Sequence, residues 1–341
     1  MKSVIMAGGE GTRLRPVTGE MPKPLVPFLG RPMLEHIILL LKNHGFDDIC
    51  IAVKYRAEDI IHAFGDGERL GVHLQYRTES TPLGTAGGVK NCGDFCGNED
   101  FLVISGDAAC DFDLNKLMQA HKNANAAITV ALYRNAQPLH YGLAVTDRDG
   151  FIRAFVEKPP WSGVVTDLVN TGIYVISPRA MEHVPAGQKF DFAKDLFPLL
   201  MNKGEKLLGV PMEGYWCDVG TPLSYYQSCV DALEGRLKLT PGEGFRVSSE
   251  DCADSDAPDG AVWFDCACRS RAQLMGTLSE AFLDLGADYS DGLILTGSRY
   301  TARISPLAAS SAVRIAVRSE DAELAKELAL SLKDIAEALD L

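Results

Sequence analysis

The chain has 341 residues, of which 46% are hydrophobic, and its 33 Lys and Arg against 46 Asp and Glu give a formal net charge of −13. This composition is typical of a folded soluble protein and excludes disordered, collagen-like and coiled-coil chains. An acidic chain without a concentrated basic patch is not expected to bind nucleic acid or an anionic membrane. At about 100–200 residues per domain, the length predicts two domains.

Short β-branched segments alternate with amphipathic segments from the N-terminus onward. The predicted strands are residues 3–7, 49–53, 101–105, 128–133, 143–146, 152–157 and 171–176, and the predicted helices are 32–44, 57–64, 113–123, 192–203 and 222–233. Such alternation predicts an α/β domain with a mostly parallel sheet covered by helices. Pro32 is predicted at a first helical position and Gly45 at a left-handed C-cap. We expect this first domain to span residues 1–239.

The rest of the chain predicts a linker and a second, smaller domain. Residues 240–261 are predicted to be an acidic linker, because six acidic residues and one arginine stand there among glycine, proline and serine. Beyond the linker, helices are predicted at 271–285 and 321–339, and strands at 293–295, 301–304 and 313–317. We therefore expect an α+β domain over residues 262–341.

Targeting signals and metal-binding cysteine motifs are not evident. Residues 1–9 hold only a short apolar run that ends at glycines, which does not predict a signal peptide. No apolar stretch reaches the ~20 residues that a bilayer requires. The nine cysteines lack paired CxxC motifs and indicate reduced thiols. We expect a cytoplasmic protein.

A glycine-rich segment, Ala7–Arg13 with the sequence AGGEGTR, directly follows the first predicted strand. Glycines allow backbone N–H groups to close around phosphates, and the basic side chains that follow add charge. A dinucleotide fingerprint starting at Gly9 would need a third glycine where the chain has Leu14, and a P-loop would need Gly-Lys-Ser/Thr, which is absent. The segment predicts another kind of phosphate loop, with a tight turn carrying incidental arginines as the alternative.

This segment and the following Pro22-Lys23-Pro24 resemble the signature of the sugar nucleotidyltransferase family, and the resemblance is closest to its mannose-1-phosphate guanylyltransferase branch. Five further short motifs carry it: Leu83–Gly87, Ser105–Asp107, Glu157–Pro159, Asn170–Gly172 and Trp216–Gly220. The resemblance implies a Rossmann-like three-layer α/β/α domain. Such a domain would bind a nucleoside triphosphate and a sugar 1-phosphate at the carboxyl ends of its strands.

The resemblance also implies the reaction, in which a sugar-phosphate oxygen attacks the α-phosphorus of the nucleotide and pyrophosphate leaves. Both reactants are anionic, so charge neutralisation is the main catalytic task. We predict that Arg13 binds the β- and γ-phosphates and that Lys23 stabilises the α-phosphate. Asp107 and Asp218 are predicted to share Mg²⁺, which takes one or two protein oxygens plus substrate phosphates. In the alternative, Asp107 caps a turn and Asp218 pairs with a nearby base.

Two sets of binding residues complete the predicted site. The nucleotide-binding set is Ala7, Gly8, Gly9, Gly11, Thr12, Arg13, Glu79, Gly84 and Thr85. The sugar-phosphate-binding set implied by the resemblance is Gly142, Glu157, Lys158, Asn170 and Thr171. The neighbouring Asp111 and Asp113 are assigned to loop and helix-capping roles instead.

Glu79 bears on the choice of nucleotide. It stands where uridylyl- and thymidylyl-transferring relatives carry a glutamine, which can both donate and accept hydrogen bonds. A carboxylate only accepts, and guanine presents its N1–H and its N2 amine as adjacent donors. Glu79 therefore favours GTP, with a surface-exposed Glu79 as the alternative.

Residues from about Cys266 onward resemble the last domain of phosphohexomutases, through Ser290–Ile294 and the strand 313–317. The stretch aligned with the mutase phosphate loop, Ser305–Ser311, lacks the arginine and most of the hydroxyl donors of that loop. Mutase activity is therefore not expected. We expect a non-catalytic domain that serves assembly or regulation.

The predicted function is Mg²⁺-dependent synthesis of GDP-mannose from GTP and mannose 1-phosphate. Two alternatives stay open. One keeps the reaction but uses UTP or dTTP with glucose 1-phosphate, or GTP with heptose 1-phosphate. The other is a catalytically silent subunit that senses nucleotide sugars. The expected partners are these small molecules, and assembly into a homo-oligomer is left open.

Overall fold

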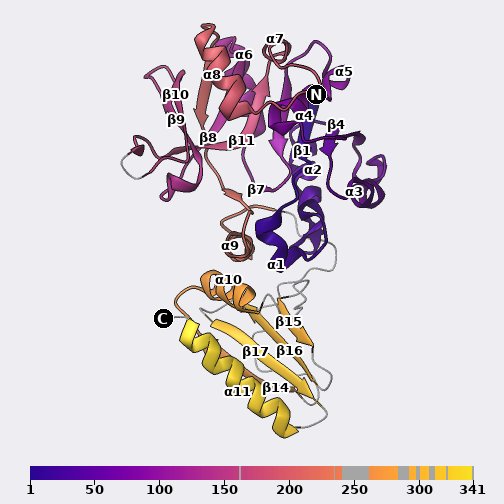
Figure 1. Cartoon of the computed structure of the whole chain (residues 1–341), viewed down its shortest axis with the longest axis vertical. Coiled ribbons are helices and arrows are strands. Elements are labelled where there is room, and N and C mark those ends of the chain that lie inside the picture. The colour runs from indigo at the N-terminus through magenta and orange to yellow at the C-terminus, as the bar shows by residue number, and fades with distance from the viewer. Residues whose placement is uncertain are drawn as a thin grey trace. The chain divides into compact units, whose positions relative to one another are not determined.

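The computed structural model describes residues 1–160, 163–233, 235–239, 261–282, 292–296, 300–306, 312–319 and 322–339. The chain divides into two compact units (Figure 1). The first unit is Met1–Glu10 with Leu34–Trp216, and the second is Gly11–Met33 with Cys217–Leu341. The predicted linker lies outside the described residues except for Ala261, so the predicted domain boundaries stay a prediction.

A nine-stranded sheet forms the first unit. Its strands are β1 (Lys2–Ala7), β4 (Asp48–Val53), β5 (His73–Thr78), β6 (Phe101–Ser105), β8 (Ile128–Arg134), β9 (Gly142–Thr146), β10 (Ile152–Glu157), β11 (Leu168–Ile176) and β12 (Leu207–Pro211). The order is β10-β9-β11-β6-β1-β4-β5, with β8 pairing to β11 and to β12. Strands β6, β1, β4 and β5 run parallel, and β11 lies antiparallel to β6. The predicted α/β class is confirmed.

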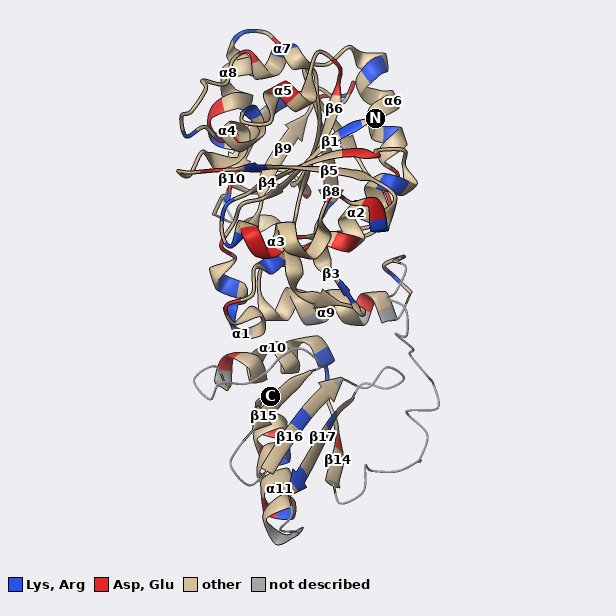
Figure 2. Cartoon of the chain, turned by 90° about the vertical axis from the view of Figure 1, so that its right-hand side faces the viewer, with Lys and Arg blue, Asp and Glu red and all other residues tan. Residues whose placement is uncertain are grey.

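Helices cover both faces of this sheet. They are α2 (Met33–Asn43), α3 (Ala57–Phe64), α4 (Gly84–Lys90), α5 (Gly93–Cys96), α6 (Leu114–Ala124), α7 (Pro178–Met181) and α8 (Phe197–Asn202), which follows the π-helical turn η6 (Phe192–Leu196). In Figure 2, α4 and α5 lie on one side of the strands, and α2 and α3 on the other. Strands covered on both faces carry consecutive buried apolar residues, as in β1, where Val4 and Ile5 are both fully buried. The chain thus forms the predicted three layers.

The ends of the helices follow most of the sequence signals. Gly45 adopts a φ of 78° after α2, as predicted for a left-handed C-cap. Asp113 caps α6, because its side chain accepts hydrogen bonds from the backbone N–H groups of Asn115 and Lys116. Pro32 differs from its prediction: it ends the short strand β3 (Arg31–Pro32), and α2 begins at Met33.

The second unit holds a small α+β layer and the segments next to it. Its antiparallel sheet has the order β14 (Ala261–Ala267), β17 (Ala312–Ser319), β16 (Tyr300–Pro306) and β15 (Leu293–Thr296). Its helices are α1 (Arg15–Thr18), α9 (Pro222–Leu233), α10 (Arg271–Ala281) and α11 (Ala322–Leu339), with short 3-10 turns η1 (Thr12–Leu14) and η2 (Lys23–Leu25). The predicted small C-terminal α+β domain is confirmed, and its bounds stay a prediction. Residues 290–291 and 307–311 of the mutase-like motifs lie outside the described residues.

No helix in the described ranges is long and apolar enough to cross a bilayer.

A buried histidine fastens α6 to the end of the first sheet. Nδ1 of His121 lies 2.8 Å from Oγ1 of Thr129, and Nε2 lies 3.0 Å from Oγ of Ser177. The His121 residue is 1% exposed. Burial lowers the pKa of His121 below its ordinary value, although the carboxylate of Asp100 opposes this effect. The folded protein therefore favours the neutral ring.

We expect the free energy of unfolding to fall as the pH drops below about 6.5, the pKa of histidine in an unfolded chain. The unfolded chain then binds a proton that His121 in the folded chain does not, so acid favours unfolding. This one side chain adds a slope of at most about 1.4 kcal/mol per pH unit. Denaturant unfolding of the wild type and of His121→Gln from about pH 7.5 to 5.5 measures it, and equal slopes would contradict the prediction.

Candidate active site

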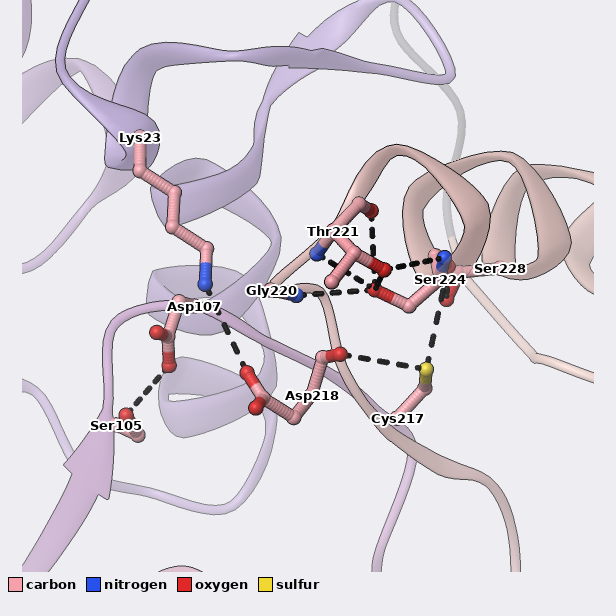
Figure 3. A network of polar contacts seen from close by, with 9 residues as sticks. All are labelled: Lys23, Ser105, Asp107, Cys217, Asp218, Gly220, Thr221, Ser224 and Ser228. Carbon is pink, nitrogen blue, oxygen red and sulfur yellow. Dashed lines mark hydrogen bonds and ion pairs between the residues drawn. The ribbon is translucent and has the colours of Figure 1, made fainter. Parts of the chain in front are cut away.

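Two basic side chains and a carboxylate meet in the second unit. Nζ of Lys23 lies 3.7 Å from Oδ1 of Asp218, and the Lys23 side chain is only 8% exposed (Figure 3). A Cβ built on Gly220 would lie 3.0 Å from Nη2 of Arg13 and 3.3 Å from Oδ2 of Asp218. The structure thus brings three of the predicted catalytic residues to one turn.

The backbone around Lys23 explains its fixed position. Gly11 adopts a φ of 64°, and a Cβ there would lie 3.0 Å from Cβ of Lys23, so the glycine-rich loop packs on the lysine stem. Lys23 opens the turn η2 between two prolines, whose fixed φ angles leave the backbone little freedom. The ammonium is therefore held in place and not extended into solvent.

The turn that carries Asp218 is held by the first turn of α9. The N–H of Gly220 donates to the backbone carbonyl of Asp218 at 2.9 Å. Oγ of Ser224 accepts from the N–H groups of Gly220 and Thr221, both at 3.0 Å (Figure 3). Ser224 was not among the predicted residues, although a serine three residues after Thr221 is a recognisable helix-start signal. Asp218 thus depends on the position of α9.

In the first unit, Asp107 follows the end of β6. Oγ of Ser105 donates to Oδ1 of Asp107 at 2.5 Å (Figure 3). The N–H of Gly106 donates to the carbonyl of Met6 in β1 at 2.8 Å, and a Cβ on Gly106 would lie 3.1 Å from Cβ of Ala7. Asp107 therefore lies at the carboxyl edge of the parallel strands, where open α/β sheets bind ligands.

Glu79 is half-buried and turned toward two glycines of the same unit. Its Oε2 accepts a hydrogen bond from the N–H of Leu83 at 3.1 Å, just before α4. Its Oε1 would lie 2.5 Å from a Cβ on Gly88 and 3.7 Å from a Cβ on Gly8. The structure thus joins Glu79 to the predicted glycine-rich loop and adds Gly88, which the sequence reasoning missed. A solvent-exposed Glu79 is not what the structure shows.

The hydroxyl of Thr85 makes hydrogen bonds to other groups of the protein. Its Oγ1 donates to Oδ2 of Asp191 at 2.9 Å and accepts from the N–H of Phe192 at 3.0 Å. A Cβ on Gly84 would lie 2.7 Å from the carbonyl oxygen of Phe190, so this position requires glycine. The nucleotide contacts of Gly84 and Thr85 stay a prediction.

Three of the predicted sugar-phosphate residues come together. A Cβ on Gly142 would lie 2.8 Å from Oε2 of Glu157 and 4.0 Å from Cβ of Asn170. Lys158 is exposed and adopts a φ of 43°, in the left-handed region. Thr171 differs, because its hydroxyl is buried and donates to the carbonyl of Ala131 at 2.7 Å. The Thr171 side chain thus fastens β11 to β8 and does not join the other predicted residues.

The donor chemistry at Asp107 and Asp218 fits a hard divalent cation. Both offer carboxylate oxygens, and a magnesium site commonly takes one or two of these and completes its shell with phosphate and water. Among the described residues, no three His, Cys, Asp or Glu side chains form a group that could hold a metal alone. A cation at either carboxylate would depend on substrate oxygens and water for most of its ligands.

Comparison with known proteins decides the family. A family model described as nucleotidyl transferase matches residues 2–235. The chain belongs to the nucleotidyl transferase family. Members of this family generally use divalent metal ions. The match ends before β14, so the phosphohexomutase likeness of the C-terminal part stays a prediction.

Similar proteins are found among curated sequences and solved structures. A UTP–glucose-1-phosphate uridylyltransferase of Synechocystis sp. is 36% identical over 72% of this chain and 67% of its own length. A mannose-1-phosphate guanylyltransferase of Mycobacterium tuberculosis is 34% identical over 68% of this chain and 65% of its own length. The chain thus spans about two thirds of these relatives. HddC from Yersinia pseudotuberculosis, crystallised with GMP-PN, shares 29% identity and a TM-score of 0.59, over 67% of this chain and 97% of that chain.

Proposed function

We propose that this nucleotidyl transferase joins mannose 1-phosphate to GTP, giving GDP-mannose and pyrophosphate. The meeting of Arg13 and Lys23 at the Asp218–Gly220 turn carries the proposal, because a reaction between two anions needs fixed positive charge. The guanylyltransferase relative from Mycobacterium tuberculosis supports the choice of substrates.

The buried ammonium of Lys23 suits the α-phosphate, where negative charge builds up as the new bond forms. An oxygen of the sugar 1-phosphate forms a bond to the α-phosphorus, and the bond from this phosphorus to the bridging oxygen breaks. The electron pair of that bond leaves with pyrophosphate. The guanidinium of Arg13 offers a planar fork to the departing β- and γ-phosphates.

The carboxylates of Asp107 and Asp218 are proposed to hold Mg²⁺. When bound, this ion would neutralise phosphate charge. The cluster of Gly142, Glu157 and Asn170 is proposed to bind the sugar, with Lys158 on its phosphate. The carboxylate of Glu157 can accept hydrogen bonds from sugar hydroxyls. The eight described cysteines are free thiols, which fits the cytoplasmic location that we propose.

Glu79 supports guanine as the base. Its carboxylate has two acceptor oxygens, and Oε1 lies beside Gly8 at the start of the glycine-rich loop. Guanine offers two adjacent donors to such a group, whereas uracil and thymine place a carbonyl oxygen beside their N3–H. The repulsion between acceptors disfavours the pyrimidine nucleotides.

The variant Glu79→Gln is expected to lower kcat/KM for GTP by about 5- to 100-fold relative to UTP. The glutamine carbonyl can still accept from the N–H of Leu83, so α4 keeps its cap and only the acceptor beside Gly8 changes. Steady-state kinetics with both nucleotides, together with thermal unfolding, measure the effect. An unchanged GTP-to-UTP ratio in a variant of normal stability would refute the role of Glu79.

A second candidate is transfer from UTP to glucose 1-phosphate. The Synechocystis relative, which is 36% identical, is named for this reaction. In this chain the reaction would use the same charged residues, and only the base and sugar contacts would differ. The third alternative, a silent sensor, is disfavoured because a protein that only binds nucleotide sugar has no need for a buried lysine facing Asp218.

A further inference from the structure

Helix α10 is buried on more than one side. Along it, Leu274, Met275 and Leu278 are at most 1% exposed, and Ser279 is fully buried. The helix packs on β15 and β16 of its own sheet, and also on α9 and α1 of the same unit. A helix that is buried around most of its circumference normally lies between two layers. Helix α10 therefore connects the C-terminal sheet to α9 and α1.

The contact between α10 and α9 is made by backbone at one point. A Cβ built on Gly276 would lie 3.0 Å from Cα, 3.1 Å from Cβ and 3.2 Å from N of Leu223. Backbones approach this closely only where a residue lacks a side chain. The Leu223 side chain itself is 45% exposed, so the contact depends on the Leu223 backbone more than on its isobutyl group.

This contact falls on the turn that holds a catalytic group. Leu223 lies in the first turn of α9, next to Ser224, whose hydroxyl accepts from the N–H groups of Gly220 and Thr221. Helix α10 also touches α1, which begins two residues after Arg13. The C-terminal domain thus contacts α9 and α1, the helices that follow Asp218 and Arg13.

We infer that Gly276 and Leu223 are positioning residues, through which the C-terminal domain holds the Asp218 turn in its catalytic geometry. The inference rests on the proposed function for its kinetic consequence only. It assigns a role to a domain whose sequence retains no catalytic motif. A side chain at position 276 would push α9 away from α10 and carry the Ser224 cap, and with it Asp218, out of place.

The test uses the full chain with Gly276→Ala and Gly276→Leu. We expect kcat to fall about 3- to 10-fold for alanine and about 10- to 100-fold for leucine, with KM for the sugar 1-phosphate unchanged. The gain in helix propensity from alanine opposes the strain of a Cβ 3.0 Å from Cα of Leu223, so thermal unfolding of both variants is measured to separate a loss of kcat from a loss of folded protein. Gly93→Ala is the matched control, because a Cβ on Gly93 would meet no atom within 4 Å.

Hydrogen exchange followed by mass spectrometry provides a readout that does not depend on activity. Peptides covering residues 217–225 should exchange faster in both Gly276 variants, and peptides covering 101–110 should not.

Normal kcat and normal exchange in both Gly276 variants would overturn the inference, as would a loss of kcat fully explained by unfolded protein. If the wild type shows no transferase activity, the proposed function fails, and exchange alone then decides the inference.

Discussion

Replacement of Lys23 by methionine is expected to lower kcat about 1000-fold, equivalent to about 4 kcal/mol of transition-state stabilisation. Methionine keeps an unbranched stem that can pack against Gly11, and it removes the positive charge beside Asp218. The loss should appear in kcat rather than in KM, because the α-phosphate gains charge only as the reaction proceeds. Pyrophosphate release under saturating substrates measures it.

The control for this substitution is Lys203→Met, which replaces an exposed lysine by methionine. Its kcat should stay within about twofold of the wild type. Thermal unfolding of both variants shows whether the chain remains folded. A folded Lys23→Met variant that keeps more than about a third of the wild-type kcat would remove Lys23 from the mechanism.

The second large effect is expected for Asp107→Asn, which should lower kcat by about 1000-fold or more. Asparagine has nearly the same shape and can still accept from Oγ of Ser105, so the turn after β6 should keep its conformation. What changes is the charge that we propose binds Mg²⁺. The dissociation constant of the sugar 1-phosphate, measured by calorimetry, should change by less than about threefold.

A neighbouring aspartate supplies the matched control. Oδ1 of Asp111 accepts from the N–H of Tyr215 at 2.6 Å, a contact that an amide oxygen can also make. Asp111→Asn should therefore keep kcat within about fivefold of the wild type. Comparable losses in the Asp107 and Asp111 variants would show that a general disturbance of this loop, and not the Asp107 carboxylate, explains the effect.

The fold could be predicted where strands are buried on both faces. The run Phe101–Ser105 is apolar up to its final serine, and the structure places a strand there with the same bounds. Strand β5, with the sequence HLQYRT, was missed because it lies at the sheet edge and carries mostly polar side chains. Strands are predicted from runs of apolar residues, and these runs reflect burial. An edge strand is buried on fewer sides, so its sequence gives a weaker signal.

Helix α4, with the sequence GTAGGVK, was missed for a different reason. Three glycines argue against a helix, since glycine costs about 1 kcal/mol relative to alanine. The structure explains their presence by close approach: a Cβ on Gly87 would lie 2.7 Å from the carbonyl oxygen of Gln188. Here tertiary packing outweighs the low helix propensity of glycine. A single sequence does not show such tertiary contacts.

In the candidate site, too, some residues could be predicted from the sequence and others could not. Charged residues within motifs, such as Arg13, Lys23 and Asp218, could be predicted, and the structure brings these three together. The roles of hydroxyl groups were harder to predict, because a threonine in a motif can bond either to a ligand or to the protein itself. Thr85 and Thr171 both bond to protein groups instead. The contact of Gly276 with Leu223 leaves no mark in the sequence.

The central claim is guanylyl transfer to a sugar 1-phosphate, and pyrophosphate release by the purified chain with Mg²⁺ tests it most directly. The assay crosses the four common nucleoside triphosphates with mannose, glucose and heptose 1-phosphates. We expect rapid release with GTP, fastest with mannose 1-phosphate, and little with the other nucleotides. Release that depends on UTP or dTTP instead would contradict the assignment of Glu79 to guanine, and no release with any pair would contradict the transferase itself.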